Sequence, residues 1–369
     1  MRILFIFGTR PEAIKLAPLI LEFQRHARFQ VKVCITAQHN EMLAPVLEFF
    51  RIRPDYNLSV MKENQSLFHL TSGILAGLEK VLDQARPEII FVQGDTASTL
   101  AGALAGFYFQ CRVAYVESGL RSFCKYAPYP EEMNRLLAAQ LSDIHFTPGT
   151  AAARNLRKMG IKQDVYTVGN TGIDALLAGL AVMKKDGPAR NRSFSSFSVH
   201  RKWIIVTCHR RESIGDGIRH ICAALKKIAR RYSREIEIIF PVHLNPLVRK
   251  MIHAELKGIR NIHLIKPLSY PEMLYLMGRC YCILTDSGGI QEEAPYLGKP
   301  VLVLRNETER KEGIRAGVAR LVGTDQKKIY HALEEFLVRP AKYRVMARKM
   351  KLYGDGKASV RIRKIISRI

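Results

Sequence analysis

Short apolar runs alternate along the whole chain with longer amphipathic segments. A brief apolar run predicts a buried strand, whereas a long amphipathic stretch such as residues 66–82 predicts a helix. The predicted strands are residues 2–7, 30–37, 88–93, 113–116, 144–148, 165–169, 203–208, 235–240, 262–266 and 280–285. Because nearly continuous apolar character is typical of strands that are covered on both faces, this pattern predicts an α/β protein with parallel sheets.

A polar segment, residues 184–202, separates the two halves of the chain. It is rich in Ser, Gly, Pro and Arg and has neither helical nor strand periodicity, which is typical of a linker. We therefore expect an N-terminal α/β domain over residues 1–183, a linker over residues 184–202 and a C-terminal domain over residues 203–352 that repeats the same plan. A length of 369 residues with 47% hydrophobic content is sufficient for two packed cores.

The chain carries a large excess of positive charge, with 58 Lys and Arg against 33 Asp and Glu and a formal net charge of +25. Such a surface attracts polyanions. The basic residues are spread along the chain, however, and no spacing typical of a nucleic-acid-binding module occurs. We expect solvated surface charge together with a cationic cleft for an anionic substrate, and no nucleic-acid partner. Weak contact with anionic membrane surfaces stays open.

The sequence offers no signal for export, membrane insertion or metal binding. No run reaches the roughly 18 apolar residues of a membrane helix, and residues 1–7 enter a strand pattern directly rather than a signal peptide. The seven cysteines include no CxxC pair. Cys280 and Cys282 are expected on one face of a strand, as core residues rather than metal ligands. These features predict a cytoplasmic protein with reduced thiols and no integral membrane segment.

The late stretch of residues 280–304 predicts a strand, a short helix and a second strand. Ser287, Gly288 and Gly289 fall at the expected start of this helix, where backbone N–H groups and the helix dipole favour a phosphate group. Glu293 lies about one and a half turns further on, where a carboxylate can accept both hydroxyls of a ribose. An ordinary βα turn with glycines for close packing explains this stretch equally well.

Charged side chains also follow the predicted strands of the first half. Arg10 and Lys15 come after the first strand, Asp95 after residues 88–93 and Glu117 after residues 113–116. The carboxyl ends of parallel strands form the usual ligand edge of an open sheet. A carboxylate there is costly to bury unless it is solvated or used, which makes Asp95 a functional candidate.

Three further candidates have plausible structural explanations. Glu131 lies at the start of a predicted helix, where an acidic side chain also interacts favourably with the helix dipole. Gln38 and His39 follow the second strand, where a lone histidine is more often a local cap than a ligand. The sequence contains neither GxGxxG after a strand nor a P-loop, so we expect neither a nicotinamide cofactor nor ATP hydrolysis.

Taken together, the motifs resemble those of the bacterial non-hydrolysing UDP-N-acetylglucosamine 2-epimerases. The resemblance covers nearly the entire chain. Its motifs, in chain order, are GTRPEAIKLAPL at residues 8–19, QHNEM at 38–42, GDTAST at 94–99, VESGLRS at 116–122, PEEMNR at 130–135, GN at 169–170, HRRES at 209–213 and DSGGIQEEAPYLGKPVL from residue 286, followed by TER. Individually these motifs are weak or moderate, but in this order they form a specific set.

The resemblance implies a glycosyltransferase-B-like architecture, in which two Rossmann-like domains face each other across a central cleft. It also implies a homodimer and a C-terminal helix, residues 353–369, that returns to the N-terminal domain. In the family's mechanism UDP leaves carbon 1 while a proton leaves carbon 2, which gives 2-acetamidoglucal. UDP then returns with protonation from the opposite face. Two faces require two proton carriers, and cations near the pyrophosphate stabilise the departing charge.

The resemblance carries these roles onto individual residues. The catalytic positions are matched by Asp95, Glu117, Glu131 and His209. The UDP-binding positions are matched by Arg10, Lys15, Met273, Ser287, Gly288, Gly289, Glu293 and Arg310. The positions that bind a second UDP-N-acetylglucosamine as an allosteric activator are matched by Gln38, His39, Arg210 and His243.

Four residues depart from the family pattern. Met273 stands where an aromatic residue often lines the base pocket, and Lys311 replaces the usual proline after TER; both bear on nucleotide affinity. Ser118 replaces alanine and Ser213 replaces asparagine beside catalytic positions. Two related enzymes remain as alternatives, a hydrolysing epimerase that releases N-acetylmannosamine and a glycosyltransferase on the same fold. A catalytically inactive nucleotide-sugar sensor is a third.

Overall fold

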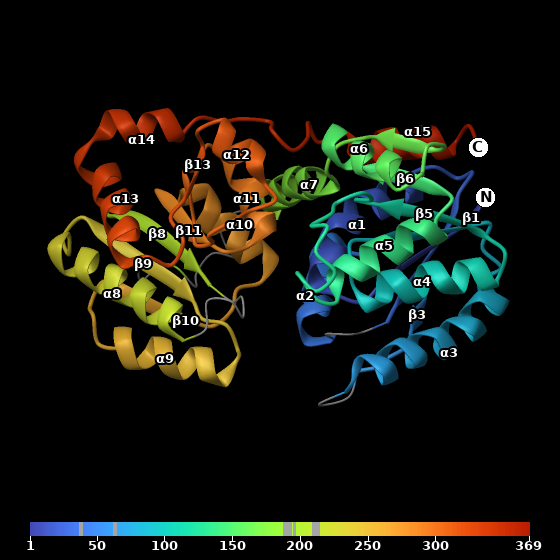
Figure 1. The fold of residues 1–369 in the computed structure, drawn as a ribbon, viewed down its shortest axis with the longest axis horizontal. Helices are drawn as coiled ribbons and strands as arrows, with labels where there is room; N and C mark the ends of the chain where they lie inside the picture. The colour runs from blue at the N-terminus through green and yellow to red at the C-terminus, as the bar shows by residue number, and fades with distance from the viewer. Residues whose placement is uncertain (37–39, 62–64, 187–193, 195–196, 209–214) are drawn as a thin grey trace. The chain divides into compact units, whose positions relative to one another are not determined.

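The computed structural model describes residues 1–36, 40–61, 65–186, 194, 197–208 and 215–369. Its chain divides into two compact units (Figure 1). Unit 1 comprises Met1–Gly179 and Tyr353–Ile369, and unit 2 comprises Leu180–Leu352. Part of the expected linker, residues 184–202, lies outside the described residues.

Unit 1 is built on a parallel sheet of seven strands. The strands are β1 (Arg2–Phe7), β2 (Gln30–Ile35), β3 (Tyr56–Asn57), β4 (Ile89–Gln93), β5 (Arg112–Val116), β6 (Ile144–Thr147) and β7 (Val165–Thr167). The helices are α1 (Arg10–Gln24), α2 (Asn40–Phe50), α3 (Leu67–Ala85), α4 (Ala97–Tyr108), α5 (Glu131–Leu141), α6 (Thr150–Lys158), α15 (Ala358–Ile366) and the first part of α7 (Thr171–Asp186), which enters unit 2 after Gly179. The strand order β3-β2-β1-β4-β5-β6-β7 reverses direction between β1 and β4. Ligands of open α/β sheets bind outside the carboxyl ends of the strands at such a reversal.

Unit 2 repeats this plan with six parallel strands in the order β10-β9-β8-β11-β12-β13. The strands are β8 (Lys202–Thr207), β9 (Ile236–Pro241), β10 (Ile262–Ile265), β11 (Cys282–Thr285), β12 (Val301–Val303) and β13 (Ala319–Leu321). The helices are α8 (Asp216–Arg231), α9 (Pro246–Leu256), α10 (Tyr270–Arg279), α11 (Gly288–Glu293), η3 (Ala294–Leu297), α12 (Lys311–Arg315), α13 (Gln326–Val338) and α14 (Pro340–Met346). The reversal of strand order falls between β8 and β11, so this unit also has a ligand-binding edge there.

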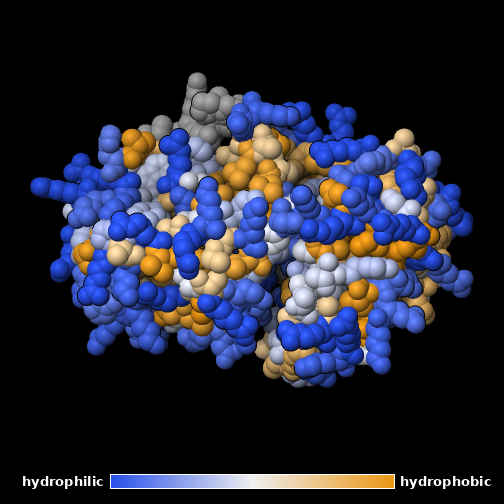
Figure 2. Space-filling view, turned by 90° about the horizontal axis from the view of Figure 1, so that it is seen from above, coloured by the Kyte–Doolittle hydropathy of each residue, from blue (hydrophilic) through white to orange (hydrophobic). Residues whose placement is uncertain are grey.

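The apolar runs form the cores, as their pattern predicts. Phe5, Phe91 and Phe146 lie on three strands of the first sheet, with ring centroids of Phe5 and Phe91 4.8 Å apart, and all three are fully buried. Aromatic pairs at this separation add to the stability that burial provides. Polar and charged residues cover much of the face seen in Figure 2, where apolar residues form small groups. None of the described helices could span a membrane.

The two parallel sheets confirm the expected fold class, and each predicted strand is present with ends within two residues of the prediction. The pattern missed β3 and β13, which are only two and three residues long. One detail was wrong. Cys280 is the C-cap residue that follows α10 and lies before β11, so it does not share a strand face with Cys282, although both are buried.

The last helix belongs to unit 1 because side chains far away in the sequence hold it. The carboxylate of Asp174 on α7 accepts hydrogen bonds from the backbone N–H groups of Ala358 and Ser359, at 3.2 and 2.8 Å. These two groups would otherwise be unsatisfied donors at the start of α15. Near the other end of the helix, Arg363 forms an ion pair with Glu22 of α1 at 2.8 Å. The C-terminal segment therefore packs on α1 within unit 1.

Candidate functional sites of the two units

Asp95 and Glu117 lie side by side at the carboxyl edge of the first sheet. Asp95 follows β4 and Glu117 follows the neighbouring strand β5. The backbone N–H of Gly94 donates to the carbonyl oxygen of Val116 at 3.3 Å, which joins the two chains one residue before each carboxylate. Parallel pairing thus brings together two acids that are 22 positions apart in the sequence.

Glu117 is held by two donors. Lys15 Nζ lies 2.5 Å from Glu117 Oε1, and Gln93 Nε2 donates to Glu117 Oε2. The side chains of Lys15 and Glu117 are only 14% and 8% exposed. Losing one partner of so buried an ion pair costs about 3–5 kcal/mol. The family resemblance assigns Lys15 to the nucleotide, and in the structure its ammonium group is paired with Glu117.

The backbone of Glu117 adopts a left-handed conformation with φ of 66°. That conformation is uncommon for a residue with a side chain and costs of order 1–3 kcal/mol. Ser118, the next residue, is buried with its hydroxyl 3.0 Å from Nδ1 of His145. Burial lowers the pKa of this histidine. The departure from alanine at Ser118 therefore adds a buried polar contact directly beside Glu117.

Asp95 is held by two residues of α5. Arg135 donates from Nη2 and Nε to Asp95 Oδ2, at 2.5 and 3.0 Å, and the amide of Asn134 donates to the backbone oxygen of Asp95 at 2.8 Å. Glu131, the first residue of α5, lies three and four positions before them and so shares their helix face. The three predicted carboxylates thus belong to one neighbourhood, at the ends of two strands and the start of one helix.

The Oε2 atom of Glu131 is buried and has no hydrogen-bond partner within the described part of the chain. Buried polar atoms normally have a partner, so an exception at this edge of the sheet is consistent with a role toward a ligand. The next residue, Glu132, has a structural task, because it accepts from Arg121 Nε at 2.6 Å and from the backbone N–H of Ser122 at 2.9 Å. Burial raises the pKa of Glu132, but these hydrogen bonds outweigh burial and lower it overall.

Unit 2 places Ser287 at the N-cap of α11, with Gly288 and Gly289 as the first helical residues. The backbone N–H of Ser287 donates a hydrogen bond to Thr285 Oγ1 at 2.9 Å. A Cβ atom on Gly288 would lie 2.8 Å from Cζ of Arg310, so the absence of a side chain leaves room for that guanidinium group. The structure therefore brings Gly288 and Arg310 together beyond the end of β11.

Arg310 is held by neighbouring carboxylates. Its Nε donates to Glu292 Oε1 at 2.9 Å, and its Nη1 lies 3.3 Å from Glu309 Oε2. Burial raises the pKa of Glu309, but hydrogen bonding and attraction to Arg305 and Arg310 outweigh it and lower the pKa to about 2. Glu292 lies on a different face of α11 from Glu293, and its carboxylate orients the guanidinium group of Arg310.

Glu293 is nearly buried at the end of α11, where its Oε1 lies 3.4 Å from the hydroxyl of Tyr270. Tyr270 begins α10, and Met273 lies one turn later on the same helix with its side chain partly exposed. Within this unit, α10 and α11 therefore supply a carboxylate and an apolar side chain near one another. This is the combination expected around a ribose and a base.

Four predicted residues cannot be placed, because Gln38, His39, His209 and Arg210 lie outside the described residues, as does Ser213. His243 is exposed, and its Nδ1 accepts the backbone N–H of Asn245 at 3.2 Å. Arg10 is partly exposed at the first position of α1. Among the described residues no group of three or more His, Cys, Asp or Glu side chains could hold a metal ion.

Sequence reasoning missed two residues that hold the acids, Gln93 and Arg135, and also the structural role of Glu12. Gln93 is the last residue of an apolar strand, and a polar side chain in that position was the available signal. Arg135 lies four residues after Glu131, a helical spacing that places both on one face. In the sequence, Glu12 has the pattern of a first-turn acid that interacts favourably with the helix dipole. In the structure it is buried and accepts hydrogen bonds from two turns of the chain.

Comparisons with known proteins agree with this geometry. A family model described as UDP-N-acetylglucosamine 2-epimerase matches residues 21–367. The UDP-N-acetylglucosamine 2-epimerase of Yersinia pestis is 46% identical over 99% of this chain and 98% of its own length. A crystal structure of the Neisseria meningitidis enzyme bound to UDP-GlcNAc is 44% identical, covers 100% of both chains and has a TM-score of 0.95. The Methanocaldococcus jannaschii enzyme in complex with UDP-GlcNAc and UDP is 34% identical, also over 100% of both chains, with a TM-score of 0.86.

Proposed function

Because this chain belongs to the UDP-N-acetylglucosamine 2-epimerase family, we propose that it interconverts UDP-N-acetylglucosamine and UDP-N-acetylmannosamine without releasing the free sugar. The observation that supports this most is the grouping of Asp95, Glu117 and Glu131 at one edge of a sheet, with Arg135 and Lys15 as their cations. A transferase needs a nucleotide site and an acceptor, but no such set of proton carriers.

The reaction requires no redox step. The bond from carbon 1 to the UDP oxygen breaks as the proton on carbon 2 passes to a carboxylate, which leaves a double bond in 2-acetamidoglucal. The reverse addition consumes this double bond, with UDP returning to carbon 1 and a proton arriving at carbon 2 from the opposite face. Carboxylates near the ring stabilise the positive charge that develops there, which lowers the barrier. We assign the proton transfers to Asp95, Glu117 and Glu131 as a group.

The nucleotide is assigned to the other predicted residues. A pyrophosphate carries negative charge that the N–H groups of Gly288 and Gly289 and the guanidinium of Arg310 are suited to bind, and Ser287 at the N-cap is assigned to the same group. Glu293 is assigned to the ribose hydroxyls and Met273 to the base. Arg10 and Lys15 add cations on unit 1, and His209 is assigned to the departing diphosphate.

Regulation and assembly extend the proposal. We assign Gln38, His39, Arg210 and His243 to a second UDP-N-acetylglucosamine that activates the enzyme, for which a sigmoidal dependence of rate on substrate concentration is the expected sign.

A homodimer is supported by aromatic side chains that unit 1 exposes on two helices that pack together, α3 and α4. Phe68 of α3 is 86% exposed, and Phe107 and Tyr108 of α4 are exposed as well. Large exposed aromatic groups are typical of protein interfaces. The product is assigned to surface polysaccharide precursors in the cytoplasm.

The test is to incubate the protein with UDP-N-acetylglucosamine in heavy water and to follow the sugar by NMR. Deuterium at carbon 2 of a sugar still attached to UDP is the expected result. Release of free N-acetylmannosamine would instead show hydrolysis, and an unchanged substrate would refute epimerisation. Asp95→Asn, Glu117→Gln and Glu131→Gln should each lose most turnover while still binding UDP. The matched control is Glu79→Gln, an exposed isosteric change on α3 that should leave turnover unaffected.

A further inference from the structure

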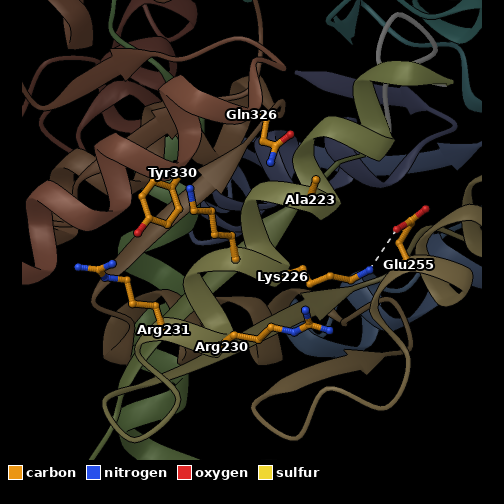
Figure 3. A pocket seen from close by; sticks show the side chains of 8 residues that line it. Ala223, Lys226, Arg230, Arg231, Glu255, Gln326 and Tyr330 are labelled. Atoms are coloured by element: carbon orange, nitrogen blue, oxygen red, sulfur yellow. Dashed lines mark hydrogen bonds and ion pairs between the residues drawn. The ribbon is translucent and has the colours of Figure 1, made fainter.

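A basic groove lies on the helices that cover the second sheet, between α8, α9 and α13. It has a volume of about 610 Å³. Figure 3 shows its cationic side chains along the C-terminal half of α8, with Tyr330 of α13 on one side and Glu255 of α9 on the other. The cations are Lys226, Lys227, Arg230 and Arg231. Four positive side chains thus face a single carboxylate in the lining.

Two of these four cations have no ion-pair partner within the described ranges of the chain. Lys226 pairs with Glu255 at 3.4 Å, and Arg231 lies 3.3 Å from Glu334. Lys227 and Arg230 form no ion pair there. Glu334 is further engaged by the hydroxyl of Tyr330, which donates to it at 2.7 Å. The groove therefore retains a net positive charge after its own pairs are formed.

The helix dipole does not account for the whole cluster. Cations in the last turn of a helix interact favourably with its carbonyl ends, which is a sufficient explanation for Arg230 and Arg231. Lys226 and Lys227 lie a full turn earlier, where the dipole effect has faded. Lys227 is also held in place, because its Nζ lies 4.4 Å from the ring centroid of the buried Tyr330. A positioned, unpaired ammonium group in a concave site is suited to an anionic ligand.

The groove is distinct from the site proposed for UDP. Ser287 and Arg310 lie beyond the carboxyl end of β11, whereas the groove lies on the outer helices and its cations follow α8 toward the amino edge of the sheet. A parallel βα unit returns its helix from the carboxyl edge to the amino edge, so the two places are at different edges of unit 2.

We propose that this groove binds clustered phosphate groups, two or more on one ligand or surface. Guanidinium groups bind phosphate through paired N–H donors and ammonium groups bind it as point charges, and both kinds are present here. The volume falls in the range of small-ligand sites, which suits a short chain of phosphates. The same chemistry is offered by a soluble oligophosphate and by the headgroups of an anionic membrane, and the experiment separates these two sources.

Three proteins are compared by titration calorimetry with inorganic tripolyphosphate at low and at physiological ionic strength. They are the wild type, Lys227→Gln/Arg230→Gln in the groove, and the control Arg249→Gln/Lys250→Gln on the exposed side of α9. Both variants remove two positive charges from unit 2, so general electrostatic attraction changes equally. In the groove variant, one tripolyphosphate-binding event should disappear or its dissociation constant should rise about tenfold or more. In the control variant, the dissociation constant should stay within about twofold of the wild-type value. Binding should weaken with added salt.

Co-sedimentation of the same proteins with phosphatidylglycerol vesicles and with phosphatidylcholine vesicles tests the membrane source. If the groove variant, unlike the control, loses binding to phosphatidylglycerol vesicles but keeps binding to tripolyphosphate, the site is assigned to lipid headgroups. If it loses binding to tripolyphosphate but keeps binding to the vesicles, the site is assigned to a soluble ligand. The proposal is overturned if the wild type binds neither probe, or if the two variants weaken binding equally. Thermal unfolding of each variant, with a midpoint close to that of the wild type, verifies that the comparison concerns folded protein.

Discussion

The buried carboxylate of Glu12 gives a sharp test of how the site of unit 1 is held together. Its Oε2 accepts from the backbone N–H groups of Gly8 and Thr9, at 2.9 and 2.7 Å, and from the Thr9 hydroxyl at 2.8 Å. Its Oε1 accepts from the hydroxyls of Thr96 and Thr99, at 2.5 and 3.1 Å. One side chain therefore joins the turn after β1 to the turn after β4.

These two turns carry Arg10 and Asp95, so loosening them should affect turnover as well as stability. In Glu12→Gln one acceptor oxygen becomes an NH₂ group, which cannot accept from the donors that surround it. A buried donor left without a partner costs about 1–3 kcal/mol, and this is the destabilisation expected for the glutamine variant. Glu12→Ala removes both acceptors and leaves a cavity, for which about 3–5 kcal/mol is expected. Displacement of Asp95 should lower turnover about tenfold or more.

The effect of pH has a definite sign. Burial raises the pKa of Glu12, and the hydrogen bonds from Thr96, Gly8 and Thr9 oppose burial without cancelling it. A carboxyl whose pKa is higher in the folded than in the unfolded state contributes stability below its unfolded pKa, and this contribution is lost as pH rises through the folded pKa. The unfolded value is near 4.5. Wild-type protein should therefore exceed Glu12→Gln in stability by more at pH 5 than at pH 8.

The measurement is urea unfolding of wild type, Glu12→Gln and Glu12→Ala at both pH values, with epimerisation followed in parallel. Glu48→Gln, on the exposed face of α2, is the matched control and should shift the free energy of unfolding by no more than about 0.5 kcal/mol. A glutamine variant as stable and active as the wild type, or a stability difference that grows with pH, would refute the reasoning.

Three further predictions concern the second unit, the C-terminal helix and the dimer. Gly288→Ala should weaken UDP binding, measured by calorimetry, at nearly unchanged stability, because the added Cβ displaces the flexible end of Arg310. The control Gly278→Ala, an exposed position of α10 with open space around it, should bind UDP normally. Asp174→Ala should cost about 2–3 kcal/mol in chemical unfolding, because two N–H donors of α15 lose their acceptor, and unchanged stability would contradict this role. Phe68→Ser should shift the mass measured by light scattering from dimer toward monomer, and a monomeric wild type would contradict the dimer.

The strands and the residues at their ends could be predicted from the sequence because both are local signals. Apolar runs located the strands of both sheets, and the polar residue that follows a run located Asp95 and Glu117. The short strands β3 and β13 could not be found in this way, since two or three residues carry no periodicity. Cys280 was misplaced for a related reason, because an apolar residue that ends a helix has the same pattern as one that begins a strand.

The partners of the acids depended on tertiary structure. Lys15 and Glu117 are 102 positions apart, and only the pairing of strands around β1, β4 and β5 makes them neighbours. The same holds for Arg135 with Asp95 and for Asp174 with the start of α15. By itself, the sequence determined which residue types stand at the ends of strands, because backbone propensity and hydrophobic pattern act over a few residues. The fold decided which of them meet, because a buried charge must be compensated by groups that long-range packing supplies.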